Sequence, residues 1–162
     1  VAANPLAKTS PPLLGTEAPD IITGSFGSEL ISGGPGSDQL TGGLGADRFA
    51  LTFGDPVADL ILDFTPGQDK IQIDGVTRGS KLDRVLKGAS QSSKVLRTVD
   101  GRRASAVAKT LYVYDAQSGS LFFNANGSKK GFGSGGGVVA ELSAGLRLTG
   151  ADMEFNYAPP LA

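Results

Sequence analysis

The sequence predicts an all-β fold, a parallel β-roll capped by a C-terminal antiparallel β module. Two observations predict this architecture. Four nine-residue units follow one another without a gap from Gly15 to Ala50, and each has room for one tight turn and one very short strand. Beyond the units, stretches with alternating apolar residues are separated by turn residues as far as the C-terminal end of the chain.

The repeated units are GTEAPDIIT, GSFGSELIS, GGPGSDQLT and GGLGADRFA. Glycine occupies the first position, an acid the sixth and a large apolar residue the eighth. The first positions are Gly15, Gly24, Gly33 and Gly42, the sixth are Asp20, Glu29, Asp38 and Asp47, and the eighth are Ile22, Ile31, Leu40 and Phe49. A flexible Gly/Ser linker would not keep this register over four units, so we interpret the units as coils of a solenoid.

Each class of position has a physical role in such a coil. Glycine allows the tight turn and lets backbone carbonyls approach an ion. The acid supplies a charged oxygen, and the apolar residue is the single inward side chain of its short strand. Because two units make one full coil, acids eighteen residues apart are expected to face one shared cation.

The composition limits the kind of cation. The chain has 24 glycines among 162 residues and contains no cysteine, histidine or tryptophan. The sequence therefore excludes disulfides, Cys/His zinc sites, Ser-His-Asp triads and cysteine nucleophiles. Carboxylates, hydroxyls and carbonyls remain as ligands, and such a set suits Ca²⁺ before Mg²⁺.

Residues 55–74 predict a strand, a turn and a second strand. Leu60, Leu62 and Phe64 alternate before the turn at 65–67, and Ile71 and Ile73 alternate after it. Residues 75–109 are basic and carry few structural signals. We expect a short helix near 82–86 and an exposed loop at 101–103. Without interleaved aromatic residues, this stretch is interpreted as a solvated loop and not as a nucleic-acid surface.

The C-terminal part predicts a β module at 110–157. TLYVYD and SLFFN are expected to form a hairpin around residues 117–119, a glycine-rich loop follows at 131–137, and strand signals recur at 138–142 and in the closing segment 148–157. The hairpin aromatics Tyr112, Tyr114, Phe122 and Phe123 are expected to form its core. Residues 1–14 are expected to be a flexible lead-in, 15–74 the roll with its closing strands, and 158–162 a tail.

The nonapeptides resemble the RTX (repeats-in-toxin) calcium-binding family. DLILDFTPGQDKIQI resembles the D-x-I-x-D-F-x-x-G-x-D-x-I segment that follows such repeats, and TLYVYDAQSGSLFFNANG, VVAEL and LTGADMEF resemble the β-rich cap that ends such chains. The resemblance implies one Ca²⁺ between Asp20 and Asp38 and a second between Glu29 and Asp47. Further ions would use the turns of the later repeats. The residues implied there are Gly33, Gly34, Gly36, Gly42, Gly43, Gly45, Asp59, Asp63 and Asp69.

The sequence also departs from the family pattern. Thr16 and Ala18 replace glycine in the first turn, and Ser25 does so in the second. Glu29 stands where the repeat has Asp, and its longer side chain must fold back or bind through water. We expect the site that uses Glu29 to be the weaker one.

The resemblance implies a secreted bacterial protein, kept unfolded inside the cell, exported by a type I secretion machinery and folded by Ca²⁺ outside. We expect no enzyme, since Ser118 and Ser134 have no base to activate them. A structural or adhesive role with cell-surface or matrix partners is favoured. The alternative is the C-terminal folding and secretion module of a larger secreted enzyme or toxin, which the start at Val1 would suit. A calcium sensor is a third possibility, and no apolar run is long enough for a transmembrane segment.

Overall fold

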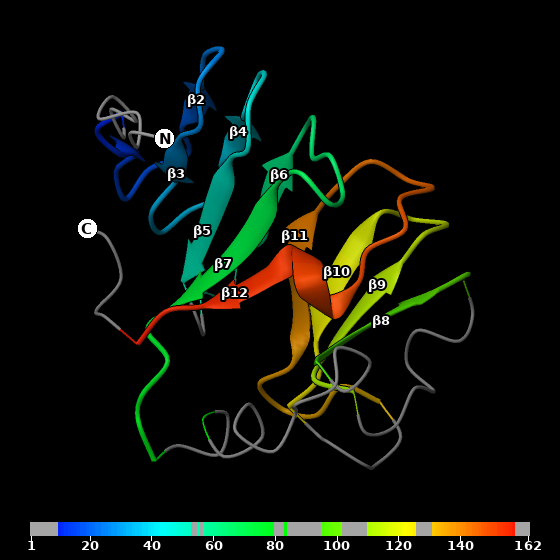
Figure 1. Cartoon of the computed structure of the whole chain (residues 1–162). Coiled ribbons are helices and arrows are strands. Elements are labelled where there is room, and N and C mark those ends of the chain that lie inside the picture. Colours follow the sequence, from blue (N-terminus) through cyan, green and yellow to red (C-terminus); the bar gives the residue numbers. More distant parts are fainter. Residues whose placement is uncertain are drawn as a thin grey trace, which may run out of the picture.

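The computed structural model describes residues 10–52, 55, 57–79, 83, 95–101, 110–125 and 131–157. Two sheets carry the described part of the chain (Figure 1). The first has the order β1-β3-β5-β7-β12 and the second β2-β4-β6-β11-β10-β9-β8. The strands are β1 (Leu13–Leu14), β2 (Ile21–Thr23), β3 (Leu30–Ser32), β4 (Gln39–Thr41), β5 (Arg48–Thr52), β6 (Asp59–Ile61), β7 (Lys70–Asp74), β8 (Leu96–Val99), β9 (Tyr112–Asp115), β10 (Ser120–Phe123), β11 (Gly137–Glu141) and β12 (Met153–Phe155).

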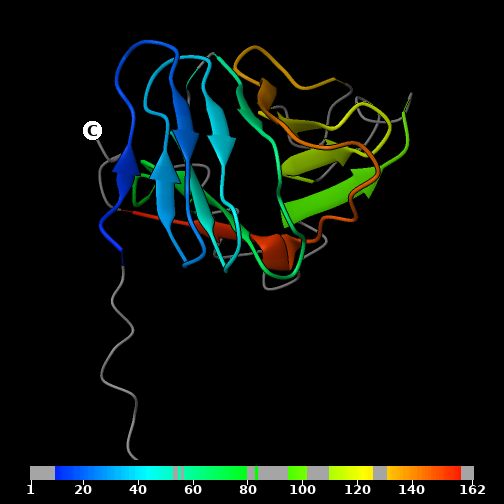
Figure 2. The same cartoon turned by 90° about the horizontal axis from the view of Figure 1, so that it is seen from above.

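The predicted roll is confirmed. The chain passes from one sheet to the other at each nonapeptide, and equivalent strands of successive coils pair in parallel (Figure 2). Ile22 aligns with Leu40, and Ile31 aligns with Phe49, so the eighth positions stack inside the coil. Ile31, Leu40 and Phe49 are fully buried, as their predicted inward position requires. The roll begins before the first nonapeptide, because β1 pairs with β3.

Strands β6 and β7 add one more coil. In β6, the residues that face inward are not the ones that the sequence predicted. Ile61 is the inward residue of β6, since it aligns with Leu40, whereas Leu60 and Leu62 are 36% and 47% exposed. Phe64 is buried, but it lies in the turn, after the chain has left the strand. A strand's inward face is set by its hydrogen-bonded neighbour, and this neighbour places Ile61 inward.

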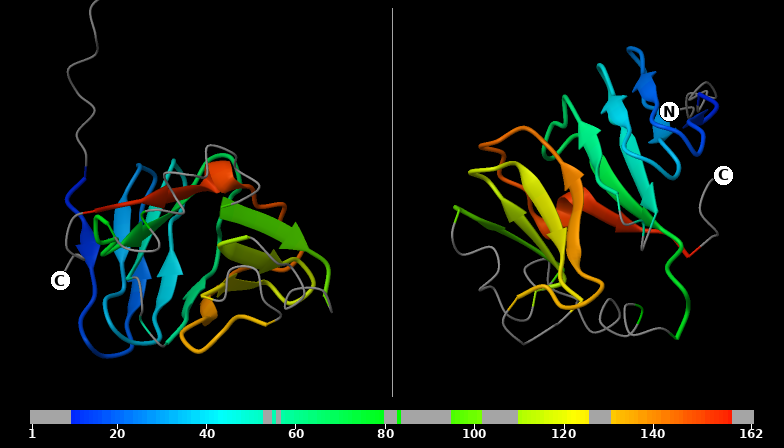
Figure 3. Two further views of the ribbon diagram at one scale, coloured as in Figure 1. Left: turned by 90° about the horizontal axis from the view of Figure 1, so that it is seen from below. Right: turned by 180° about the vertical axis from the view of Figure 1, so that it is seen from behind.

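The C-terminal module closes the roll by extending both of its sheets. The predicted hairpin is present as β9 and β10, which pair in antiparallel fashion. Strand β11 continues from β10 and pairs in parallel with β6, while β12 pairs in parallel with β7 (Figure 3). The last coil of the roll is thus covered at both strands by C-terminal segments.

Three of the four hairpin aromatics belong to the core, as expected. Tyr112 and Tyr114 are buried, and the Tyr112 ring lies 5.4 Å from that of Phe123 and 6.0 Å from that of Phe155, between ring centroids. Phe122 is only half-buried and stacks on Phe132 at 4.6 Å. The Phe155 contact belongs to β12, so the aromatic core joins the hairpin to the strand that closes the roll.

The basic stretch contains a strand that the sequence did not indicate. Strand β8 lies at the outer edge of the second sheet and pairs in parallel with β9. The expected helix at 82–86 lies outside the described residues except for Asp83, and so does the expected loop at 101–103 except for Gly101. In the described part of the chain, no helix is long and apolar enough to cross a bilayer.

Candidate metal centre

The acidic sixth positions lie in two rows of stacked turns. Turns 24–29, 42–47 and 62–69 lead into β3, β5 and β7 at one edge of the roll, where the loops project side by side at the top of Figure 1. Turns 15–20 and 33–38 and the approach to β6 form the row at the opposite edge. Each acid directly precedes its strand, so the parallel pairing of the strands brings acids of adjacent coils together.

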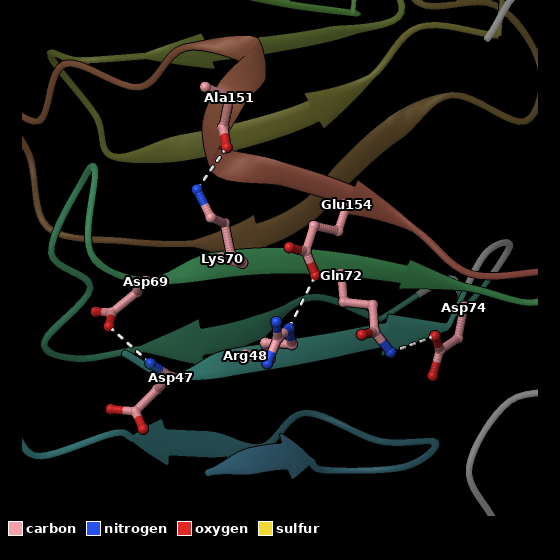
Figure 4. Close-up of polar contacts among 8 residues, drawn as sticks. All are labelled: Asp47, Arg48, Asp69, Lys70, Gln72, Asp74, Ala151 and Glu154. Atoms are coloured by element: carbon pink, nitrogen blue, oxygen red, sulfur yellow. Dashed lines mark hydrogen bonds and ion pairs between the residues drawn. The ribbon is translucent and has the colours of Figure 1, made fainter. Parts of the chain in front are cut away.

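Hydrogen bonds connect the acids of each row into a ladder. The backbone N–H of Asp20 donates to Oδ1 of Asp38 at 2.8 Å, and that of Asp38 donates to Oδ1 of Asp59 at 3.1 Å. In the other row, the N–H of Glu29 donates to Oδ1 of Asp47 at 2.9 Å. The N–H of Asp47 in turn donates to Oδ1 of Asp69 at 3.0 Å (Figure 4). One carboxylate oxygen of each accepting residue is therefore held by the preceding coil.

The second oxygens of Asp38 and Asp47 have no partner among the described residues. Both oxygens are buried, and the two residues are 0% and 1% exposed. An unsatisfied buried acceptor costs about 1–3 kcal/mol, and more when it carries a charge. A hard cation bound beside these oxygens would remove that cost, which makes these two carboxylates the best-fitting anchors for calcium in the structure.

Glycine at the first position keeps the space around these oxygens open. A Cβ atom at Gly33 would lie 2.0 Å from Oδ2 of Asp38, and one at Gly42 would lie 2.4 Å from Oδ2 of Asp47. The other predicted glycines have left-handed φ values, namely 89° at Gly34, 136° at Gly36, 92° at Gly43 and 117° at Gly45. The turns therefore depend on glycine both for space and for backbone conformation.

The first two turns satisfy their own carboxylates. The backbone N–H and the hydroxyl of Thr16 donate to Oδ2 of Asp20 at 2.6 and 2.9 Å. The hydroxyl of Ser25 donates to Oε1 of Glu29 at 2.6 Å. These hydroxyls occupy the second position, where the later repeats have glycine. The sequence shows that Thr16 and Ser25 replace glycine, but only the structure shows to which oxygens their hydroxyls donate.

Asp63 and Asp69 accept backbone hydrogen bonds with both of their oxygens. Asp63 receives the N–H groups of Gly42 and Gly43, each at 2.8 Å. Asp69 receives the N–H of Thr65 at 2.8 Å in addition to that of Asp47. In the described part of the chain, no three carboxylates gather as a cation site. A bound cation would therefore take many of its oxygens from the carbonyls of the turns.

Burial and the charges of neighbouring acids make Asp59 and Asp47 costly to ionise. Burial raises the pKa of Asp59 from 3.8 to about 7; the hydrogen bond from Asp38 offsets part of this, and the charges of Asp38 and Asp55 add to it. Burial also raises the pKa of Asp47, with contributions from the charges of Asp69 and Glu29. Asp55 was not among the predicted site residues. Such a cluster is stabilised by taking up either protons or a divalent cation.

Asp152 lies at the end of the row that contains Glu29, Asp47 and Asp69, although it belongs to no repeat. Its Oδ1 accepts from the N–H of Gly67 at 2.7 Å, and its Oδ2 accepts from the N–H and the hydroxyl of Thr149 at 2.7 and 3.0 Å. Thr149 and Asp152 form a capping box around the short helix at Gly150–Asp152. Only the Thr-x-x-Asp spacing could have indicated this residue from the sequence, and it does not predict the contact with Gly67.

Comparison with known proteins identifies the repeats. Residues 14–55 match the family model of the RTX calcium-binding nonapeptide repeat, in four copies. No curated protein sequence matches the chain. Among solved structures, the chain is similar to the solution structure of the AlgE6R3 subunit from the Azotobacter vinelandii mannuronan C5-epimerase, at 18% sequence identity and a TM-score of 0.38. That similarity covers 93% of this chain and 85% of the other.

Proposed function

We propose that this chain, whose residues 14–55 match four copies of the RTX calcium-binding nonapeptide repeat, is a non-catalytic module that Ca²⁺ folds outside the cell. We further propose that it is exported by a type I route and has a structural or adhesive role at a cell surface or in a matrix. The observation that carries the calcium part is a pair of buried oxygens, one on Asp38 and one on Asp47, that have no partner among the described residues and lie between stacked glycine turns.

Each proposed ion joins two coils. The first lies between the turns of Asp20 and Asp38, and the second lies between those of Glu29 and Asp47. The N–H bonds that already link these pairs of residues support this assignment. Further ions use carbonyls of the later turns together with Asp59, Asp63 and Asp69. At Asp63 and Asp69 the cation shares oxygens that each already accept one backbone N–H.

Calcium supplies stability that the short strands lack. Each three-residue strand of the repeats carries one inward side chain, worth about 1.5–3 kcal/mol when fully buried. Ordering the backbone of the whole repeat costs about 1–2 kcal/mol for each residue. Extracellular calcium modules often have a Kd of about 10⁻⁴–10⁻³ M, so such sites stay empty in the cytosol and fill outside. This difference in calcium concentration supports folding after export.

The open edge of the roll supports the alternative function, a folding and secretion module within a larger secreted enzyme or toxin. Within the described residues, β1 and β2 are the outermost strands of their sheets, and each pairs on one side only. Leu14 is 46% exposed at this edge. Unpaired strand edges can accept further coils, so a preceding segment of a larger protein could continue the roll here.

Far-UV circular dichroism of the chelator-stripped chain tests the proposed function. We expect a cooperative gain of β signal with Ca²⁺ at sub-millimolar to millimolar concentration, and none with Mg²⁺. Asp47→Asn should raise the calcium midpoint, whereas Glu17→Gln, at an exposed acid outside the two ladders, should leave it unchanged. A stripped chain that is already folded, or one that stays unfolded at saturating Ca²⁺, would refute the calcium-folded module. Appearance of the chain in the medium only when a type I exporter is co-expressed tests the route.

A further inference from the structure

Two large apolar side chains project from neighbouring turns of the roll. Phe26 is 86% exposed and Leu44 is 63% exposed. Both occupy the third position of their repeats and lie eighteen residues apart on stacked coils. The N–H of Leu44 donates to the carbonyl of Ser25 at 3.0 Å, which joins the two turns. Two large apolar side chains that lie side by side and exposed to water indicate a binding surface.

The tips of these turns carry no charge. Residues 24–28 and 42–46 contain no acidic or basic side chain, and neither do residues 65–68 in the next turn of the row. The acids of the two turns lie beneath the surface, with Glu29 4% and Asp47 1% exposed. Removing the tips of the Phe26 and Leu44 turns from water therefore desolvates apolar groups, hydroxyls and backbone, and buries no exposed carboxylate of these two turns. Asp63 in the next turn is half-buried and already accepts two backbone hydrogen bonds.

Basic residues adjoin the uncharged tips. Arg48 directly follows the turn that carries Leu44, and Lys70 directly follows the next turn and aligns with Arg48 across the sheet. Arg147 is exposed in the loop after β11. In the same loop, the hydroxyl of Ser143 donates to the carbonyl of Leu62, which begins the turn 62–69. Glu154 pairs with Arg48 at 2.9 Å and offsets part of this charge (Figure 4). The opposite row instead exposes Glu17.

The tips are held rigidly in their projecting positions. The N–H of Ala46 donates to the hydroxyl of Ser28 at 3.0 Å, and the side-chain amide of Gln68 donates to the carbonyl of Gly45. Ordered turns lose little further conformational entropy when they bind. A convex row of apolar tips beside basic residues is suited to a deformable anionic interface, which needs no matching groove.

We propose that this edge binds an anionic phospholipid membrane, with Phe26 and Leu44 inserted at the level of the headgroups and Arg48, Lys70 and Arg147 near the phosphates. The proposal rests on the proposed function, because calcium must first order the turns that present the two side chains. Two inserted side chains give only weak and reversible binding, so the basic residues are needed and the binding falls as salt rises.

A single tryptophan can report on the insertion, because the chain contains none. The full chain carrying Phe26→Trp is loaded with Ca²⁺ and titrated with vesicles of equal parts phosphatidylglycerol and phosphatidylcholine. We expect its emission to shift to shorter wavelength, and less so with phosphatidylcholine alone or at high salt. Val57→Trp is the matched control, since Val57 is 43% exposed and precedes β6 in the opposite row. Its emission should not shift.

Vesicle sedimentation extends the test to the native side chains. The double variant Phe26→Ser, Leu44→Ser should sediment with the vesicles at least about tenfold less than the wild-type chain, while its calcium-induced circular dichroism stays the same. If the Phe26→Trp chain folds with Ca²⁺ but vesicles leave its emission unchanged, the membrane proposal alone is overturned. A blue shift that follows protein concentration without vesicles would assign the edge to self-association and overturn it too. A chain that Ca²⁺ does not fold would overturn the proposed function and the calcium dependence of the binding.

Discussion

The carboxylates of the roll differ in the number of hydrogen bonds that they accept. Asp38 and Asp47 each keep one buried oxygen without a partner in the described structure. Asp20 and Glu29 instead receive a hydroxyl from their own turn. A cation must displace that hydroxyl or share its oxygen, so the four repeats are not equivalent as ligands. The free energy of calcium binding should therefore come mainly from the third and fourth repeats.

Substitution of single acids tests this inequality. Asp38→Ala should raise the calcium concentration at the midpoint of folding by about tenfold or more, because Asp38 contacts both Asp20 and Asp59 and can serve two sites. Glu29→Ala should have a smaller effect. Calcium titrations followed by circular dichroism measure both midpoints. Equal losses for the two variants would contradict the shared role of Asp38.

At the scale of the element, each row of turns behaves as one electrostatic unit. The N–H of each coil holds one oxygen of the next, while the charges of adjacent coils repel one another. The same contacts that align the turns thus bring the carboxylates close together. Without a cation, protonation of Asp59 in one row and of Asp47 in the other lowers this repulsion.

The metal-free chain should accordingly gain stability in mild acid. The pKa of Asp59 rises from 3.8 to about 7 in the folded chain. A raised folded-state pKa contributes stability that is fully present below the ordinary value and is lost as the pH rises through about 7. Asp47 acts in the same direction. In far-UV circular dichroism, the chelator-treated chain should therefore retain more β signal at about pH 5 than at about pH 8.

Asp59→Asn is the control for this pH dependence, because it removes the titrating group and keeps the side-chain size. The variant should be less sensitive to pH than the wild-type chain when both are free of metal. A wild-type β signal that rises from about pH 5 to about pH 8 would contradict the sign of the effect.

At the scale of the whole molecule, the C-terminal segment ties the end of the chain back to the roll. Strand β12 pairs with β7 through Met153, Glu154 and Phe155. Around this pairing, Asp152 accepts from the N–H of Gly67. Arg48 pairs with Glu154, and the ammonium group of Lys70 donates to the carbonyl of Ala151 (Figure 4). Buried hydrogen bonds and an exposed ion pair thus both hold β12 against β7, but they are expected to contribute very different amounts to the free energy of unfolding.

Two substitutions separate these contributions. Asp152→Ala removes a buried carboxylate that accepts three hydrogen bonds and should destabilise the calcium-loaded chain by about 1.5–3 kcal/mol. Glu154→Gln weakens an exposed ion pair and should cost at most about 1 kcal/mol. Urea unfolding at saturating Ca²⁺ measures both. A larger loss for Glu154→Gln would show that the surface pair, and not the buried cap, holds the C-terminal segment.

The roll and the positions of its acids could be predicted from local sequence. The coil of a β-roll has the same period as the repeat, so the inward places of Ile31, Leu40 and Phe49 and the eighteen-residue spacing of the acids follow from local register. The hairpin at 112–123 was predictable for the same reason, since its strands and turn are contiguous. Which of the predicted site residues bind Ca²⁺ stays a prediction.

The end of the roll, by contrast, depends on tertiary packing. Asp152 accepts a hydrogen bond from Gly67, which lies 85 residues earlier in the sequence. Strand β12 pairs with β7 and β11 pairs with β6, and no sequence repeat predicts the register of either pair. Tertiary contacts likewise placed Asp63 on the N–H groups of Gly42 and Gly43 and turned Ile61, in place of Leu60 and Leu62, toward the core. A periodic pattern determines contacts between neighbouring coils, because each coil repeats the one before. Contacts between segments that share no period depend on packing, which no local pattern records.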